Sequence, residues 1–222
     1  MNRTLAYPLV AIGLSCAAFL AGSVPAAQTT APSDYPKPSL YPISWELKFE
    51  HKMPKRIVVD VPGSSAPSAY WYMTYGVTNN TDKEQLFLPY FEMLTRSGKV
   101  IRSDNGVPAR VFDAIKQREN NRYLQPGPKI AGELRVGEDQ AKEGVAIWPE
   151  PEPRMGTFSI FVGSLSGESV MLKDEKGEPV KDKDGQPVIL RKTLQITYQV
   201  PGDEKYPGED PIIPKGEQWV MR

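Results

Sequence analysis

Apolar residues at every second position are the feature that most restricts how this chain can fold. Between Thr193 and Val200, the apolar side chains of Leu194, Ile196 and Tyr198 alternate with polar ones. Side chains of a β-strand point alternately to its two faces, so this pattern predicts a strand with one apolar and one solvated face. We therefore expect a chain that is rich in half-buried strands.

Several other short segments have strand character and are separated by residues that favour turns. They comprise residues 45–49, 57–61, 70–77, 86–95, 100–101, 144–148 and 157–165. Asn79, Asn80 and Asp82 supply turn chemistry after one of the longest segments. Pro89 cannot donate a ladder hydrogen bond, so we expect an edge position or a bulge there.

One segment has helical spacing instead. Val111, Phe112 and Ile115 fall at helical intervals within residues 108–119, and Pro108 suits a first helical turn. A parallel sheet would need many helical crossovers, whereas about seven or eight short strands with one inserted helix favour an antiparallel sandwich. The sequence therefore predicts a mainly β fold with a single short helix.

The first residues have the layout of a secretory signal peptide between Met1 and Ala26. Arg3 gives a short positive region, residues 5–20 are mostly apolar, and residues 21–27 are rich in small side chains. An uncleaved anchor helix is the alternative, but a bilayer needs about 20 apolar residues and this run is shorter. We therefore expect a periplasmic or secreted protein with no membrane span after cleavage.

Cys16 is the only cysteine, and it lies inside the predicted signal peptide. The residues before it, Gly13-Leu14-Ser15, do not match a lipidation triplet, so a lipoprotein is not expected. Cleavage would leave a mature chain without a disulfide, a thiolate nucleophile or cysteine ligands for zinc. Its fold would then depend on its apolar core.

Proline-rich segments lie at both ends of the mature chain. Residues 27–42 contain four prolines and predict a linker or an extended lead-in. Residues 201–222 predict a tail that is either disordered or laid over the domain, and Ile212, Ile213 and Trp219 favour partial docking. The sandwich domain is expected to occupy residues 43–200.

The charges of the chain are balanced, with 27 basic and 27 acidic side chains. No basic run or face stands out, so nothing in the sequence predicts nucleic-acid binding. The expected partner is instead a protein or a glycan of the cell envelope.

A charged repeat, KDEKGEPVKDKDGQPV, begins at Lys173. Its second copy contains D-x-D-G, as in a calcium loop, but Val180 and Arg191 then occupy the positions where such a loop needs anionic ligands. Two successive turns explain the repeat better, because each copy has polar residues before Gly177 or Gly185, and Pro-Val after it. We expect a charged hairpin arm and no metal.

Reactive groups are sparse. His51 is the only histidine and no G-x-S-x-G motif occurs, so a serine triad and a multi-histidine metal site are not expected. Glu150 and Glu152 are the closest carboxylate pair in an unusual context, but alternating prolines would make their side chains diverge. We predict no catalytic residue, cofactor or metal, and keep a carboxylate-dependent hydrolase as a third hypothesis.

Aromatic residues provide the remaining candidate site. If Trp71 faces the core, then Tyr70 and Tyr72 point outward or against a second layer. The prolines after Trp148 favour a position near the surface for it. Exposed aromatic rings bind sugars and peptides, so these three are the candidate ligand-binding residues. The alternative is that the helix and the tails cover both faces.

Three stretches resemble immunoglobulin-like β-sandwich modules of exported bacterial proteins. They are YGVTNNT from Tyr75, LPYFEML from Leu88 and RSGKV from Arg96, and the strand GVAIW from Gly144 fits as well. The resemblance covers roughly residues 43–200 and implies an immunoglobulin-like topology. The Cys…Trp…Cys signature of antibody domains is absent, and the inserted helix is a departure from the pattern.

The first functional hypothesis is a non-enzymatic binding or structural module of the bacterial cell envelope. It rests on the export signal, the sandwich pattern and the scarcity of reactive groups. A carbohydrate-binding module that uses exposed aromatic residues is the alternative.

Overall fold

Two β-sheets packed face to face form the body of the protein in this computed structural model. The structure describes residues 35–63, 66–152, 154–201 and 212–222. The predicted signal peptide between Met1 and Ala26, Cys16 and the first part of the predicted linker lie outside these ranges. The predicted mainly β sandwich is confirmed, and the immunoglobulin-like topology stays a prediction.

The first sheet is centred on a long strand that is buried on both faces. Its strands are β1 (Lys48–His51), β2 (Lys55–Val59), β3 (Ser68–Thr78), β9 (Lys142–Pro149) and β7 (Gln125–Pro126). β1 and β2 pair with successive parts of β3, and β9 pairs with its other edge. All of these pairs are antiparallel except β7 with β9.

The second sheet is centred on the strand with the cleanest alternation. Its strands are β11 (Ser169–Met171), β12 (Ile189–Gln199), β10 (Thr157–Gly163), β5 (Tyr90–Leu94), β6 (Val100–Arg102) and β13 (Ile213–Met221). A small separate sheet joins β4 (Gln85–Phe87) to β8 (Gly132–Leu134). Pro89 therefore lies at a break between strands of different sheets, where we expected an edge position or a bulge.

The main core fills the space between the two sheets. Trp71, Met73 and Val77 of β3 face Phe158 and Ile160 of β10, and all five are buried. This is the alternation that the sequence predicts, since residues of equal parity share one face of a strand. Ring contacts such as Trp71 with Phe158, whose centroids are 5.7 Å apart, add to the apolar packing.

A second, smaller core lies on the outer face of the first sheet, under helix α1 (Ala109–Glu119). Val111 and Ile115 are the buried residues of α1, which confirms the predicted helix and its apolar face. Asn120 ends the helix in a left-handed conformation, with φ of 48°. The structure also contains α2 (Gly127–Ile130) and the 3₁₀-helix η1 (Glu138–Gln140), and no helix in the described ranges could cross a membrane.

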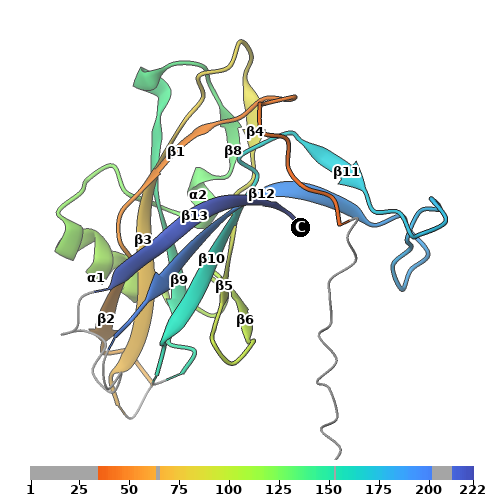
Figure 1. Cartoon of the computed structure of the whole chain (residues 1–222). Helices are drawn as coiled ribbons and strands as arrows, with labels where there is room; N and C mark the ends of the chain where they lie inside the picture. The colour runs from red at the N-terminus through yellow and green to blue at the C-terminus, as the bar shows by residue number, and fades with distance from the viewer. Residues whose placement is uncertain (1–34, 64–65, 153, 202–211) are drawn as a thin grey trace, which may run out of the picture. The chain divides into compact units, whose positions relative to one another are not determined.

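The C-terminal residues continue the second sheet. β13 pairs with β12 from Lys192 to Gln199, so the sheet extends past residue 200, where we expected the domain to end (Figure 1). Pro214 and a register shift near Gly216 interrupt this edge strand. Such irregularities and the charged side chains beside them protect an edge from pairing with other chains.

The charged repeat forms an arm between β11 and β12 (Figure 1). Each copy makes one turn, in which the Asp174 or Asp182 side chain accepts two backbone N–H bonds at 2.9 Å. Gly177 and Gly185 have φ of 83° and 79° in these turns, which confirms the turn prediction.

The eight-residue spacing of the repeat closes a ring of backbone hydrogen bonds. The Leu172 N–H donates to Val188 O, the Val188 N–H to Val180 O, and the Val180 N–H to Leu172 O, over 2.8–2.9 Å. Each copy of the repeat thus supplies one side of the ring.

Candidate functional site

A hollowed region on the outer face of the first sheet is the candidate site, and we call it the groove. It consists of a smaller hollow of about 290 Å³ beside the end of α1 and a wider one of about 910 Å³ next to it. Both hollows are lined by Leu124, Ala141, Lys142 and Glu143. The volume of the wider hollow falls within the range of about 300–1,000 Å³ that is typical of small-molecule sites, and the smaller hollow lies at its lower limit.

The floor of the smaller hollow is made of small residues of β3. Gly76 lies between Glu50 of β1 and Glu143 of β9, and a Cβ atom added to it would have no neighbour within 4 Å. Thr74 and Thr78 line the hollow on either side of Gly76. The absence of a side chain at Gly76 therefore leaves the face of the sheet open here.

The end of α1 places a carboxylate in the wall of the smaller hollow. Glu119 accepts hydrogen bonds from Lys55 Nζ and from the Tyr72 hydroxyl, both at 2.8 Å, and its side chain is 7% exposed. Burial alone would raise the pKa of Glu119, but the bonds from Lys55 and Tyr72 outweigh it, so its pKa is lowered. Glu119 therefore remains a carboxylate and holds the helix end on the sheet.

The wider hollow is lined by cations and by an exposed aromatic ring. Lys116, Arg122 and Lys129 line it, and within the described residues none of the three pairs with a carboxylate. The Tyr123 side chain is 59% exposed, and the Arg122 guanidinium lies 4.6 Å from its ring centroid. Lys116 similarly lies over the ring of Phe112.

Carboxylates line the same hollow. Glu138, Asp139 and Glu143 face it, with Asp139 accepting a bond from Gln140 and Glu143 one from Asn121. The groove thus offers hydrogen-bond acceptors as well as positive charge.

The predicted aromatic platform does not form, because all three of its residues are buried. Tyr70, Tyr72 and Trp148 are 6%, 1% and 0% exposed. α1 covers Tyr70 and Tyr72, whose rings pack in the outer core with Val111 and Ile115. The prediction that these residues are accessible to a ligand is therefore wrong. Of the alternative, the cover by the helix is correct, whereas the second sheet, and not the tails, covers the inner face.

Trp148 is buried for a different reason. It lies opposite Trp71 in the ladder between β3 and β9, so both indoles point into the space between the sheets. The exposed aromatic residue of the groove, Tyr123, lies in the turn after α1 and was not singled out by the sequence patterns. Its position four residues after the expected end of a helix was the available signal.

The single histidine links the two sheets. His51 Nε2 is 3.0 Å from Glu217 of β13, and His51 Nδ1 is 3.2 Å from the hydroxyl of Tyr198. Burial raises the pKa of the Tyr198 phenol, so this hydroxyl stays protonated. These contacts give His51 a structural role.

The two carboxylates of the proline strip make separate contacts. Glu150 forms a two-bond ion pair with Arg56 (2.6 and 3.0 Å), and the pKa of Arg56 is raised, chiefly by that hydrogen bonding. Glu152 accepts a bond from Ser97. Within the described ranges, no group of three or more metal-ligating side chains is close enough to hold an ion.

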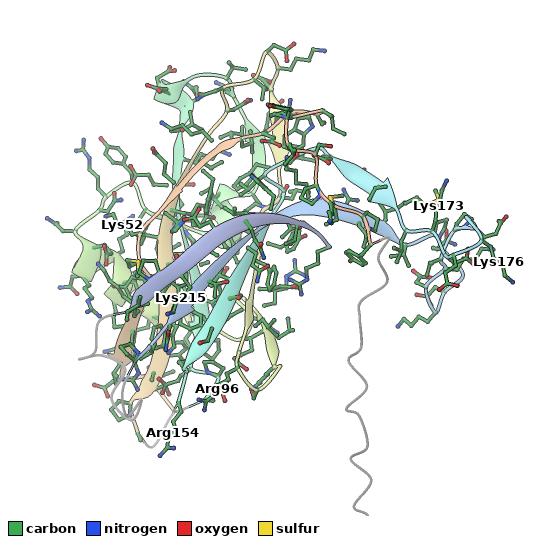
Figure 2. All side chains as sticks on the ribbon, viewed as in Figure 1. Lys52, Arg96, Arg154, Lys173, Lys176 and Lys215 are labelled. Atoms are coloured by element: carbon green, nitrogen blue, oxygen red, sulfur yellow. The ribbon has the colours of Figure 1, made fainter. Side chains whose placement is uncertain are left out.

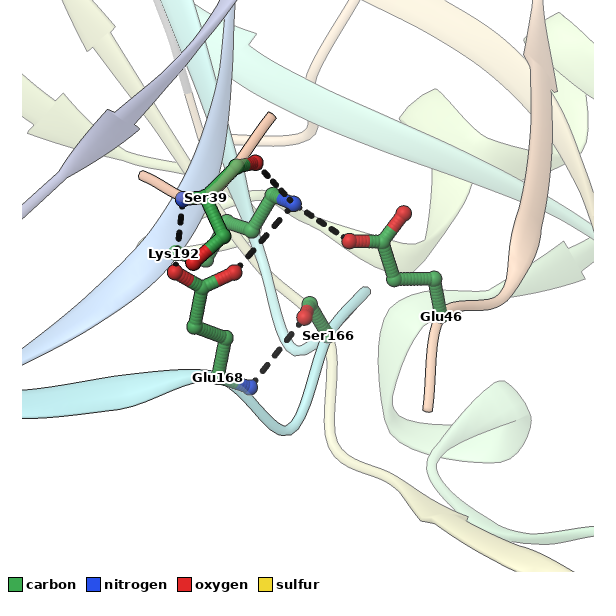
Figure 3. A network of polar contacts seen from close by, with 5 residues as sticks. All are labelled: Ser39, Glu46, Ser166, Glu168 and Lys192. Carbon is green, nitrogen blue, oxygen red and sulfur yellow. Dashed lines mark hydrogen bonds and ion pairs between the residues drawn. The ribbon is translucent and has the colours of Figure 1, made fainter. Parts of the chain in front are cut away.

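A second polar cluster, the clasp, fastens the N-terminal segment to the second sheet (Figure 3). Lys192 Nζ contacts Glu46, lies 3.3 Å from Glu168 Oε2 and donates to Ser39 O, while the Ser39 N–H donates to Glu168 at 2.8 Å. The Lys192 and Glu168 side chains are only 3% and 5% exposed. The last part of the predicted linker is thus docked on the domain.

The clasp keeps its charges in spite of burial. Burial alone would lower the pKa of Lys192 and raise that of Glu168. The contact with Glu46 and the attraction of Glu168 outweigh burial and raise the pKa of Lys192, and the hydrogen bond from Ser39 and the attraction of Lys192 lower that of Glu168. Lys192 therefore remains protonated and Glu168 ionised.

Comparison with known proteins identifies no relative of this chain: no family model, no curated protein and no solved structure matches it.

Proposed function

We propose that this protein is a non-enzymatic, exported binding module of the bacterial cell envelope and that its ligand occupies the groove. The layout of the N-terminal sequence supports export. The observation that carries the binding site is the pair of adjoining hollows. Their floor is open at Gly76, and the wider hollow exposes an aromatic ring and cations that pair with no carboxylate of the described ranges.

The fixed frame of the groove supports binding by a preformed site. Its floor is a central strand paired on both edges, and Glu119 ties the adjacent helix end to Tyr72 and Lys55. A preformed site loses little conformational entropy when a ligand binds, which favours affinity.

Filling the region shared by the two hollows tests this proposal. Glycan and peptide libraries are screened against the wild type, Ala141→Trp and the control Val58→Trp, which introduces the same side chain on β2 at an exposed position. We expect ligands to bind the wild type and Val58→Trp, and to lose affinity for Ala141→Trp. Equal binding to all three proteins would show that the groove is not the site, and chemical conversion of a bound ligand would contradict a non-enzymatic role.

Carbohydrate binding is the second candidate function, and Tyr123 is the observation that favours it. Sugar rings pack their C–H faces on exposed aromatic rings, and polar side chains around the ring bind the hydroxyls. Tyr123→Ala should then abolish glycan binding, while Tyr41→Ala, which removes an 81% exposed ring outside the groove, should preserve it. Loss of binding in both variants or in neither would argue against this function.

A further inference from the structure

We propose that the ligand of the groove is an acidic saccharide whose carboxylates lie against Lys116, Arg122 and Lys129. This inference rests on the proposed function, because it specifies the chemistry of the ligand that the same site would bind. It follows from the charges, the hydrogen-bonding groups and the aromatic ring that line the wider hollow.

The first argument is that the three cations lack acidic partners among the described residues. Other cations near the groove are engaged by the protein: Lys55 pairs with Glu119, and Lys142 donates to the carbonyl oxygens of Ile130 and Glu133. Lys116, Arg122 and Lys129 pair with no described carboxylate. Hydrogen bonds to ionised groups are stronger than neutral ones, so a ligand carboxylate would find donors here that none of the described carboxylates engages.

The second argument is the mixture of charges around the hollow. Glu138, Asp139 and Glu143 line it together with the cations. These carboxylates would repel a small anion such as phosphate, whereas they would accept hydrogen bonds from hydroxyl groups. A uronic acid has both carboxylates for the cations and hydroxyls for the acidic residues, so it fits this lining better than a simple anion does.

The third argument is the aromatic ring. Tyr123 is 59% exposed, and Arg122 lies over its ring and also donates to its hydroxyl, which restricts the position of both side chains. A sugar ring packed on Tyr123 would bring a carboxylate substituent close to the Arg122 guanidinium. The aromatic contact and the ionic contact would therefore act on the same sugar unit.

A comparison of acidic oligosaccharides with their methyl esters tests the proposal directly. The probes are trimers of galacturonate, mannuronate and guluronate, and the esters keep the rings and hydroxyls but remove the charge. We expect at least one acid to bind the wild type roughly ten-fold more tightly than its ester in calorimetric titrations. We also expect its affinity to fall as salt rises from about 50 to about 200 mM, because salt screens exposed charges.

A charge-matched pair of variants locates the effect. Lys116→Gln/Lys129→Gln removes two cations from the groove, and Lys173→Gln/Lys176→Gln removes two from the arm, well apart from it (Figure 2). We expect the groove variant to bind the acid roughly ten-fold more weakly and the arm variant to change less than about two-fold. Equal losses in the two variants would indicate a nonspecific charge effect and overturn the proposal.

The remaining outcomes separate this inference from the proposed function. If an acid and its ester bind equally, the acidic class is wrong. If a neutral ligand binds and Ala141→Trp blocks it, the groove is a binding site but the acidic class is wrong. If none of the three acids binds, the acidic class is also wrong, whatever the library screen finds. If a library ligand binds Ala141→Trp as tightly as the wild type, the groove itself is not the site.

Discussion

Replacing Lys192 by methionine should destabilise the protein by about 3 kcal/mol, because it leaves the carboxylates of the clasp without their cation. Removing one partner of a buried ion pair typically costs about 3–5 kcal/mol. Glu168, which is 5% exposed, would keep only the Ser39 N–H as a described donor, whereas Glu46 is 22% exposed and can be hydrated. The lower end of the range is therefore expected.

Urea denaturation followed by tryptophan fluorescence measures this change, provided that the slope of the transition is unchanged. Lys215→Met is the matched control, since Lys215 is exposed on β13 and should change stability by less than about 0.5 kcal/mol (Figure 2). A loss below about 1 kcal/mol for Lys192→Met, or a gain, would refute the view that the clasp needs its ammonium group.

Three further predictions concern other contacts. The pKa of Glu168 is lowered, so the stability that its carboxylate contributes is present above the ordinary glutamate pKa of about 4.3 and is lost as pH falls through the pKa of Glu168 in the folded protein. The difference in unfolding free energy between the wild type and Lys192→Met, measured by urea titration, should therefore shrink over this pH range. Tyr72→Phe removes one donor to Glu119 and should cost about 1–2 kcal/mol in the same denaturation assay, with no loss if that bond contributes nothing. Asp182→Ala removes the acceptor of two N–H bonds in the arm, so amide exchange should accelerate around this turn and stay unchanged in β10 if the arm opens independently of the sandwich.

The strands of the sandwich could be predicted because their signal is local. The alternation in β12 and the shared face of Trp71, Met73 and Val77 follow from the geometry of a single strand. Likewise, the spacing of Val111 and Ile115 identifies the buried face of α1 without reference to the rest of the chain.

The burial of the aromatic candidates was not a local property. The sequence around Tyr70 and Tyr72 shows that both faces of the strand are apolar, but not which element covers the second face. That element is α1, which begins at Ala109, far along the chain, and whose own apolar face required a partner. The sequence shows an apolar helix face and an apolar second strand face, and neither has an obvious covering element. Their packing against each other could have been inferred from this.

The sequence did not predict the strand β13, because backbone hydrogen bonds to β12 hold it in place more than buried side chains do. Most residues of β13 are exposed, and only Met221 at its end is buried. An edge strand with few buried positions shows no apolar alternation, and Pro214 and Gly216 resemble the residues of a loop. The docked Trp219, however, agrees with the expectation that this tail packs partly on the domain.

The position of the groove follows from a change of composition along the outer face of β3. Tyr70 and Tyr72 on this face are large and apolar, and α1 covers them; Thr74, Gly76 and Thr78 further along are small or polar. A helix gains little by covering small polar residues, since the apolar area that would be removed from water is small. The helix therefore ends where the apolar part of the strand ends, and the uncovered remainder becomes the floor of the groove.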